Sequence, residues 1–127
     1  ATIIAVGTMV SVALEAASLL EAKGLSVGVA DMWSLKPLDE DFVLKYASSV
    51  SAIVTLEEHS VVNGLGSAVA DVLAQHHSRA RLTKLGLPDA YPPSVSPYPV
   101  MLEDYGLTAG QVAASVEKAI RSARESQ

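Results

Sequence analysis

The chain has 127 residues, half of them hydrophobic, a formal net charge of −5 and no cysteine. This length allows one domain with its own core, and the missing cysteine excludes thiol catalysis, thiolate zinc sites and disulfides. The acidic balance and the scattered basic residues argue against nucleic acid as a partner, and no apolar run approaches the roughly 20 residues that span a bilayer.

The first 24 residues predict one strand followed by one helix. Residues 2–6, TIIAV, form an apolar, β-branched run that is typical of a strand buried on both faces. From Val10 to Leu20 the apolar residues follow helical spacing, and Gly24 is a natural helix stop.

The same alternation continues through residue 86. Asp39 is expected to cap the second helix, and the third helix shows apolar residues at i, i+3, i+4, i+7 and i+8. Strands separated by helices need crossover connections, so we expect an α/β fold with a mostly parallel sheet between two helical layers. The further strands are predicted at residues 25–32, 52–56 and 80–86, and the further helices after Pro37, up to residue 48, and at residues 64–77.

A proline-rich segment interrupts this pattern. Residues 86–107 hold five of the six prolines and are predicted to be a long loop, a feature that in a compact domain is usually functional or partner-binding. Thr108 and Gln111 then have the spacing of a capping box, which predicts a final helix over about residues 108–124.

We expect a single domain over residues 1–127. It begins directly on a strand without a signal-peptide pattern, which favours an excised domain or a split subunit in the cytoplasm.

The corner after the third strand holds the residues that best suit a functional site. Glu57, Glu58 and His59 follow the strand at the edge where open α/β sheets place their ligands, and alternation should put Glu58 on the side opposite to the other two. Backbone amides at the start of the next helix would suit an anion, although a tight structural turn or a domain interface explains the same glycines. The candidate interface or anion site consists of Glu58, His59, Asn63, Gly64, Gly66 and Ser67.

No other group of residues makes a convincing catalytic, cofactor or metal set. The glycines lack the third position of a dinucleotide-binding loop, so a nicotinamide site is not expected. His76 and His77 are adjacent and would point about 100° apart on a helix, which prevents joint chelation. The acidic residues 39–41 suit the start of a helix. We thus predict no catalytic, cofactor-binding or metal-binding residue in this chain.

Four ordered motifs resemble the C-terminal domain of the transketolase family. They are SLKPLDEDFV, AIVTLEEHSVVNGLGSAVADVL, LGLPD and LEDYGLTAGQVAASVEKAI, and they span essentially the whole chain. KPLD and EEHS are most similar to transketolase and its split C-terminal subunits, whereas LGLPD is also similar to deoxyxylulose-phosphate synthases. The β subunits of 2-oxoacid dehydrogenases are more distant relatives, which leaves a docking module for an acyltransferase core as an alternative.

The resemblance implies a Rossmann-like domain of an enzyme that moves two-carbon ketol units between sugar phosphates. Thiamine diphosphate and magnesium would be bound by upstream diphosphate- and pyrimidine-binding domains, which would be the partners of this chain in a homo-oligomer. The chain itself would carry no cofactor, would be inactive alone, and would serve a structural, dimer-stabilising or regulatory role. Relatives usually have a further strand before residue 1, so we expect an exposed sheet edge that favours self-association. Relatives also commonly have a glycine in the proline-rich loop, so a role of that loop is not carried over to this chain.

Overall fold

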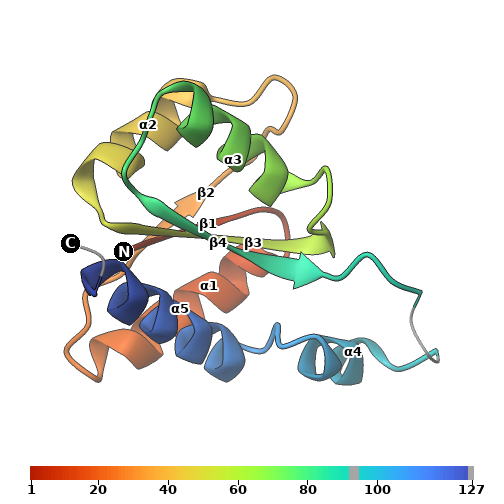
Figure 1. Ribbon diagram of the computed structural model, residues 1–127. Helices are drawn as coiled ribbons and strands as arrows, with labels where there is room; N and C mark the ends of the chain where they lie inside the picture. The colour runs from red at the N-terminus through yellow and green to blue at the C-terminus, as the bar shows by residue number, and fades with distance from the viewer. Residues whose placement is uncertain (92–94, 126–127) are drawn as a thin grey trace.

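The computed structural model describes residues 1–91 and 95–125, and these form one parallel sheet with helices on both faces (Figure 1). The strand order is β2-β1-β3-β4, so β2 and β4 are the edges. The α/β fold with a parallel sheet between helical layers is as predicted. The strands are β1 (Thr2–Ala5), β2 (Gly28–Asp31), β3 (Ala52–Ser60) and β4 (Arg81–Leu87), and the helices are α1 (Met9–Glu21), α2 (Glu40–Ser49), α3 (Leu65–Gln75), α4 (Tyr98–Asp104) and α5 (Ala109–Arg124).

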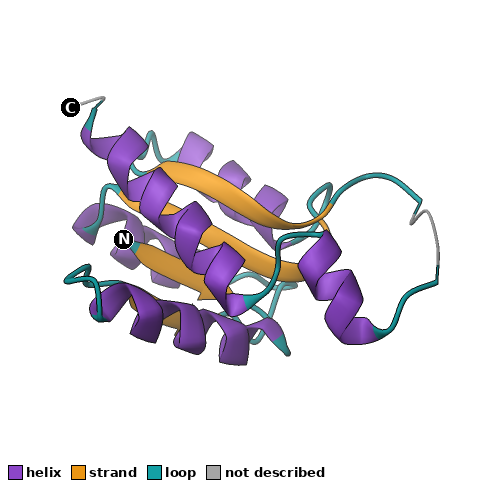
Figure 2. Ribbon diagram, turned by 90° about the horizontal axis from the view of Figure 1, so that it is seen from below, coloured by secondary structure: helices purple, strands orange, loops and turns teal. Residues whose placement is uncertain are grey.

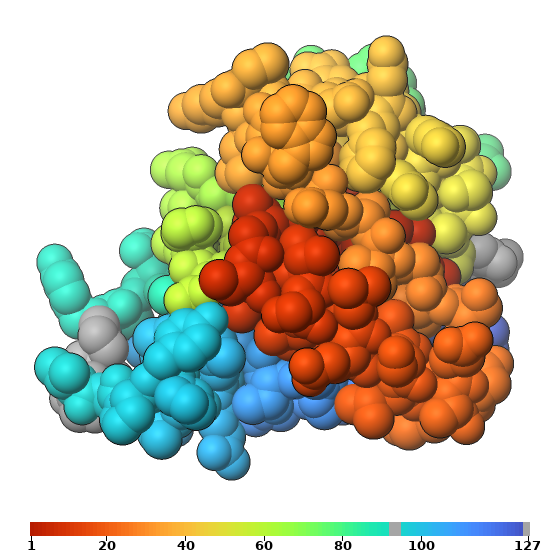
Figure 3. All heavy atoms as spheres, turned by 180° about the vertical axis from the view of Figure 1, so that it is seen from behind, coloured from red at the N-terminus to blue at the C-terminus, as the bar shows by residue number. Residues whose placement is uncertain are grey.

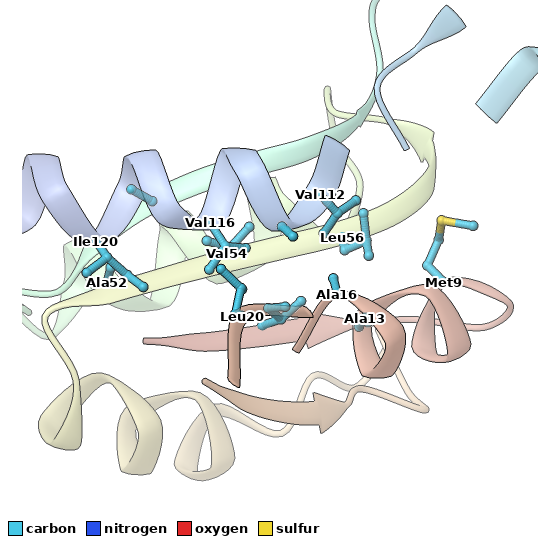
Figure 4. Packing of buried hydrophobic residues seen from close by; sticks show 14 of the residues in the cluster. Met9, Ala13, Ala16, Leu20, Ala52, Val54, Leu56, Val112, Val116 and Ile120 are labelled. Atoms are coloured by element: carbon cyan, nitrogen blue, oxygen red, sulfur yellow. The ribbon is translucent and has the colours of Figure 1, made fainter. Parts of the chain in front are cut away.

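The two helical layers each cover one hydrophobic cluster. Helices α1 and α5 lie against one face of the sheet, and α2 and α3 lie against the other (Figure 1). Alternation along β3 divides its side chains between the clusters. Val54 packs with α1 and α5 (Figure 4), whereas its neighbour Ile53 belongs to the cluster under α2 and α3. Both side chains are fully buried, so β3 is the strand on which the two layers meet.

Two of the expected helix caps are present. The Asp39 carboxylate accepts a hydrogen bond from the Phe42 backbone N–H at 2.9 Å, at the start of α2. Thr108 and Gln111 form the capping box at the start of α5, where the Thr108 backbone N–H donates to the Gln111 side-chain oxygen at 3.3 Å. Local sequence therefore determines where these two helices begin.

The structure differs from the expected elements mainly in two places, and in addition β2 begins at Gly28 instead of residue 25. The prediction of a loop over residues 86–107 is wrong for Tyr98–Asp104, which form the short helix α4, and for the first two residues, which end β4. Residues 92–94 of the predicted loop lie outside the described residues. Pro99 in its first turn is compatible with a helix, because the N–H groups of a first turn have no partner within the helix. Strand β3 also continues four residues beyond the predicted end at Leu56, and this extension contains the glutamate pair.

Helix α4 stands apart from the main body of the domain. Seen from below, it lies beside the end of the sheet (Figure 2). Leu102 and Tyr105, near the C-terminal end of α4, pack on the α1/α5 cluster, but none of the residues of α4 is fully buried.

Among the described residues, no helix combines the length and the apolar character that a bilayer-spanning segment requires.

Candidate functional site

The carboxyl ends of β1 and β3 lie side by side at the centre of the sheet. The connection after β1 runs to one edge of the sheet and the connection after β3 runs to the other, so the strand order reverses between them. In doubly wound sheets this reversal leaves a crevice that usually receives the ligand. Here β1 ends at Ala5 and β3 supplies Glu57, Glu58 and His59 at the same edge.

Glu57 is fully buried, and its carboxylate receives two backbone N–H groups. The Leu65 N–H donates to Glu57 Oε2 at 2.7 Å, and the Gly66 N–H donates to Oε1 at 2.8 Å. Both donors belong to the first turn of α3, where unpaired amides and the helix dipole favour a negative charge. Glu57 therefore caps α3 from a neighbouring strand, and its carboxylate occupies two of the amides that a bound anion would use.

The two glycines of the corner make room for this cap. A side chain at Gly64 would collide with the Glu57 carboxylate, and a Cβ at Gly66 would come within 2.8 Å of the Thr55 hydroxyl and 2.5 Å of the Lys84 side chain. The φ of Gly64 is −96°, which any residue adopts, so contact and not backbone strain requires this glycine. The glycines let α3 approach β3 closely, as the structural interpretation of the corner predicts.

The turn between β3 and α3 is closed by its own polar groups. Asn63 has a φ of 61°, a left-handed conformation that asparagine tolerates better than most residues. Its N–H donates to Ser67 Oγ at 3.0 Å, and the Ser67 hydroxyl donates to the Val61 carbonyl at 3.1 Å. Asn63 and Ser67 therefore serve the turn itself.

Glu58 points to the opposite face of the sheet, as the alternation of the strand predicts. Its Oε2 accepts hydrogen bonds from the Thr8 hydroxyl at 2.6 Å and from the Tyr98 hydroxyl at 2.8 Å. Thr8 is the N-cap residue of α1, and Tyr98 is the first residue of α4. One carboxylate thus links β3 to the turn after β1 and to α4, across the crevice between the two strands.

The surroundings of Tyr98 raise the pKa of its hydroxyl group. The contact with Thr8 lowers the pKa of Tyr98, but the bond that Tyr98 donates to Glu58, its partial desolvation and the negative charge of Glu58 raise it, and the net pKa lies above the ordinary tyrosine value. His59, in contrast, presents an exposed side chain. Of the six candidate residues, Glu58 therefore makes the contacts that reach farthest along the sequence.

The sequence did not indicate that Thr8 and Tyr98 take part in the site, or that Glu57 caps α3. The position of Glu57 directly after the apolar run AIVTL was a usable signal, because a charged residue that continues a buried strand needs a buried partner. Thr8 and Tyr98 are 50 and 40 residues away from Glu58, and no local pattern connects them.

Within residues 1–91 and 95–125, no three histidine, aspartate or glutamate side chains are grouped as metal ligands.

The sequence profile of the transketolase C-terminal domain matches residues 1–112. The chain belongs to this family. This transketolase C-terminal domain is 44% identical, over 114 residues, to the 1-deoxy-D-xylulose-5-phosphate synthase of Heliobacterium modesticaldum, a match that covers 88% of this chain and 17% of the relative. It is 51% identical over 89 residues to the corresponding synthase of Chlorobium phaeovibrioides, covering 70% of this chain and 14% of that protein.

A solved structure shares the fold of this transketolase C-terminal domain. It is a split-gene transketolase, described as an inactive beta4 tetramer, with a TM-score of 0.86 and 47% sequence identity. The match covers 94% of this chain and 39% of that chain. The domain thus spans less than a fifth of the two synthases and less than half of its structural neighbour.

Proposed function

We propose that this chain is the C-terminal domain of a thiamine-diphosphate- and magnesium-dependent enzyme of the EC 2.2.1 class that transfers two-carbon ketol units between sugar phosphates. The observation that carries this proposal is the split-gene transketolase, which matches 94% of the chain at 47% identity. A match of this extent, with the same fold, supports a common role for the domain within the larger enzyme.

The role of the chain in this enzyme is structural, in holding the dimer together or in regulation. Its conspicuous polar residues support this assignment: the Glu57 carboxylate is used on α3, and Glu58 is used on Thr8 and Tyr98. Upstream diphosphate- and pyrimidine-binding domains supply the cofactor site and the catalytic groups. The chain binds no cofactor alone, and the assembled enzyme is a cytoplasmic homo-oligomer.

A 1-deoxy-D-xylulose-5-phosphate synthase is the second candidate, because several curated relatives carry that name. Product analysis distinguishes the two. The complete enzyme, made from this chain and its upstream portion, is supplied with thiamine diphosphate, magnesium and the substrates of each reaction, and the sugar phosphates formed are identified by mass spectrometry.

We expect ketol transfer between sugar phosphates, no product without thiamine diphosphate, and no product from this chain alone. Formation of 1-deoxy-D-xylulose 5-phosphate instead would support the second candidate. An enzyme that makes neither product would refute both, and turnover by the isolated chain would refute the structural role.

A further inference from the structure

The turn between β3 and α3 contains the chain's only asparagine, and a glycine follows it. Asn63 is the single asparagine among the 127 residues, and Gly64 is the next residue. Glycine has no Cβ, so its backbone nitrogen is less hindered than that of any other residue. A bond between this nitrogen and the side-chain amide carbon of Asn63 closes a five-membered ring. The dipeptide therefore combines an electrophile and a nucleophile that are close enough to react with each other.

Both groups of this pair are accessible. In the part of the chain that the structure describes, neither the Asn63 side-chain amide nor the Gly64 backbone N–H has a hydrogen-bond partner. The backbone N–H groups on either side are bonded: that of Asn63 donates to Ser67 Oγ, and those of the two residues after Gly64 donate to the Glu57 carboxylate. Asn63 is also exposed, and in the view from behind the yellow-green turn between β3 and α3 lies at the surface (Figure 3). Solvent water therefore reaches this turn.

The folded turn slows such a reaction but does not prevent it. The Asn63 N–H is bonded to Ser67 Oγ at 3.0 Å, which fixes the backbone on one side of the pair. The φ of Asn63 is 61°, and a left-handed backbone is unfavourable for residues other than glycine, which lowers the cost of leaving this conformation. The hydrogen bond is exposed, and exposed turns open with a free energy far below that of global unfolding. We therefore expect reactive conformations to recur in the native protein.

We propose that Asn63–Gly64 is a deamidation site, at which the chain modifies itself with water as the only co-reactant. The Gly64 nitrogen loses its proton to solvent base and forms a bond to Asn63 Cγ. The bond between Cγ and the side-chain nitrogen then breaks, and this nitrogen leaves as ammonia after taking up a proton. The product is a cyclic succinimide, in which the Gly64 nitrogen is bonded to both carbonyl carbons of residue 63. No oxidation or reduction takes place.

Hydrolysis of the succinimide gives two products. One water molecule is added in either case, so the overall change is the replacement of ammonia by water. Cleavage of the bond to Cγ restores the ordinary peptide path and leaves aspartate at position 63. Cleavage of the bond to the backbone carbonyl carbon leaves isoaspartate, in which the main chain runs through Cγ and is longer by one methylene group. Both products carry a negative charge that asparagine lacks.

Isoaspartate is the product that would disturb the start of α3. Gly64 follows directly and is tightly enclosed, because a Cβ on it would collide with the Glu57 carboxylate and come within 2.7 Å of the Ser60 carbonyl oxygen. Glu57 in turn is fully buried and accepts the Leu65 N–H at 2.7 Å. A longer main chain before Gly64 would shift the first turn of α3 away from this carboxylate, which would leave a buried charge with fewer partners. Deamidation is thus expected to loosen the start of α3 slowly as the protein ages.

Peptide mapping of the complete enzyme tests the modification. The enzyme is incubated in neutral buffer below its unfolding temperature, and mass spectrometry with an isoaspartyl methyltransferase assay follows aspartate and isoaspartate at residue 63. The reference is the free peptide VVNGLGS, residues 61–67, with blocked ends. We expect both products, at a rate less than about a hundredfold below that of the peptide. A slower rate, or no conversion, would overturn the site, because the folded turn would then protect Asn63.

Hydrogen exchange tests the structural consequence. Wild type is compared with Asn63→Gly, which tolerates a φ of 61° without a side-chain amide, and with Asn63→Asp, which adds the charge without lengthening the chain. We expect the amides of residues 65–67 to exchange about tenfold faster in the isoaspartate fraction, separated by ion exchange, than in fresh wild type. Asn63→Gly should keep its protection during incubation, and freshly prepared Asn63→Asp should match fresh wild type.

Three results would contradict this consequence. They are equal exchange in the isoaspartate fraction and fresh wild type, an equal loss of protection in incubated Asn63→Gly, and fast exchange in fresh Asn63→Asp. Exchange in β1 reports whether each form is folded, and Asn63→Gln, whose longer side chain closes the ring far more slowly, is a second control. Neither measurement depends on ketol transfer, so the deamidation site can fail while the proposed function holds.

Discussion

Glu57 and Glu58 are adjacent on β3, yet their carboxylates serve helices on opposite faces of the sheet. Glu57 is fully buried and receives two N–H groups of α3, whereas Glu58 is partly exposed and accepts two hydroxyl groups. Hydrogen bonds to a charged group contribute more to stability when both partners are buried. The two residues should therefore differ widely in their energetic importance.

Replacing Glu57 with glutamine tests this difference. The amide cannot accept two N–H groups in the same geometry, because one oxygen becomes an NH₂ donor that faces another donor. We expect the free energy of unfolding to fall by about 2–3 kcal/mol. Urea denaturation followed by circular dichroism measures it. Glu58→Gln is the matched control and should cost less than about 1 kcal/mol, so equal losses would contradict the capping role of Glu57.

Gly64 provides an independent test of the same contact. A methyl group at this position would collide with the Glu57 carboxylate, so Gly64→Ala should destabilise the domain by about 1–3 kcal/mol. Gly110, in the first turn of α5, has open space around it, and Gly110→Ala should stabilise the domain by about 0.5–1 kcal/mol. Thermal unfolding of the two variants should move in opposite directions. A Gly64→Ala variant as stable as the wild type would show that the corner is looser than this contact implies.

At the scale of elements, helix α4 is held to the sheet by a bond that depends on pH. The Thr8 contact lowers the pKa of Tyr98, but Glu58 and desolvation outweigh it, so the pKa in the folded state is raised. A raised pKa means that the stabilisation is fully present at neutral pH and is lost as the pH rises through the folded pKa in the alkaline range. Absorbance titration, with Tyr98→Phe as the reference, isolates the ionisation of Tyr98. In Glu58→Gln its midpoint should fall to lower pH, and an unchanged midpoint would disprove the link.

The ion pair between the turn after α1 and helix α5 depends on pH in the opposite sense. The Lys23 ammonium group lies 3.0 Å from the Glu117 carboxylate. The hydrogen bond and the positive charge of Lys23, with a smaller effect of Arg121, hold the pKa of Glu117 below its ordinary value. The stabilisation is therefore present above the unfolded pKa and is lost as the pH falls through the folded pKa. We expect Lys23→Met to reduce stability at neutral pH and to leave it unchanged in strong acid. Urea midpoints at several pH values measure this, and a pH-independent difference would contradict it.

Helices could be predicted from the sequence where local signals determine their ends. Asp39 and the Thr108–Gln111 pair act within one turn, so the starts of α2 and α5 were accessible. Helix α4 was not, because its seven residues include a proline and its contacts come from distant parts of the chain. The site follows the same rule: the corner was located by its glycines, but the partner of each carboxylate depends on how α1, α3 and α4 pack against β3.

The molecule as a whole should unfold in one step, because both helical layers share the central strands. Ile3 and Ile4 are adjacent and fully buried, yet Ile3 belongs to the α1/α5 cluster and Ile4 to the α2/α3 cluster. Loss of either layer would expose one full face of β1 and β3, so neither layer is expected to persist alone. We predict that Ile3→Val and Ile4→Val each cost about 0.5–1.5 kcal/mol and shift the same transition. Far-ultraviolet circular dichroism and hydrogen exchange of α3 and α5 should give coincident midpoints in both variants, whereas separate midpoints would show that the two layers unfold independently.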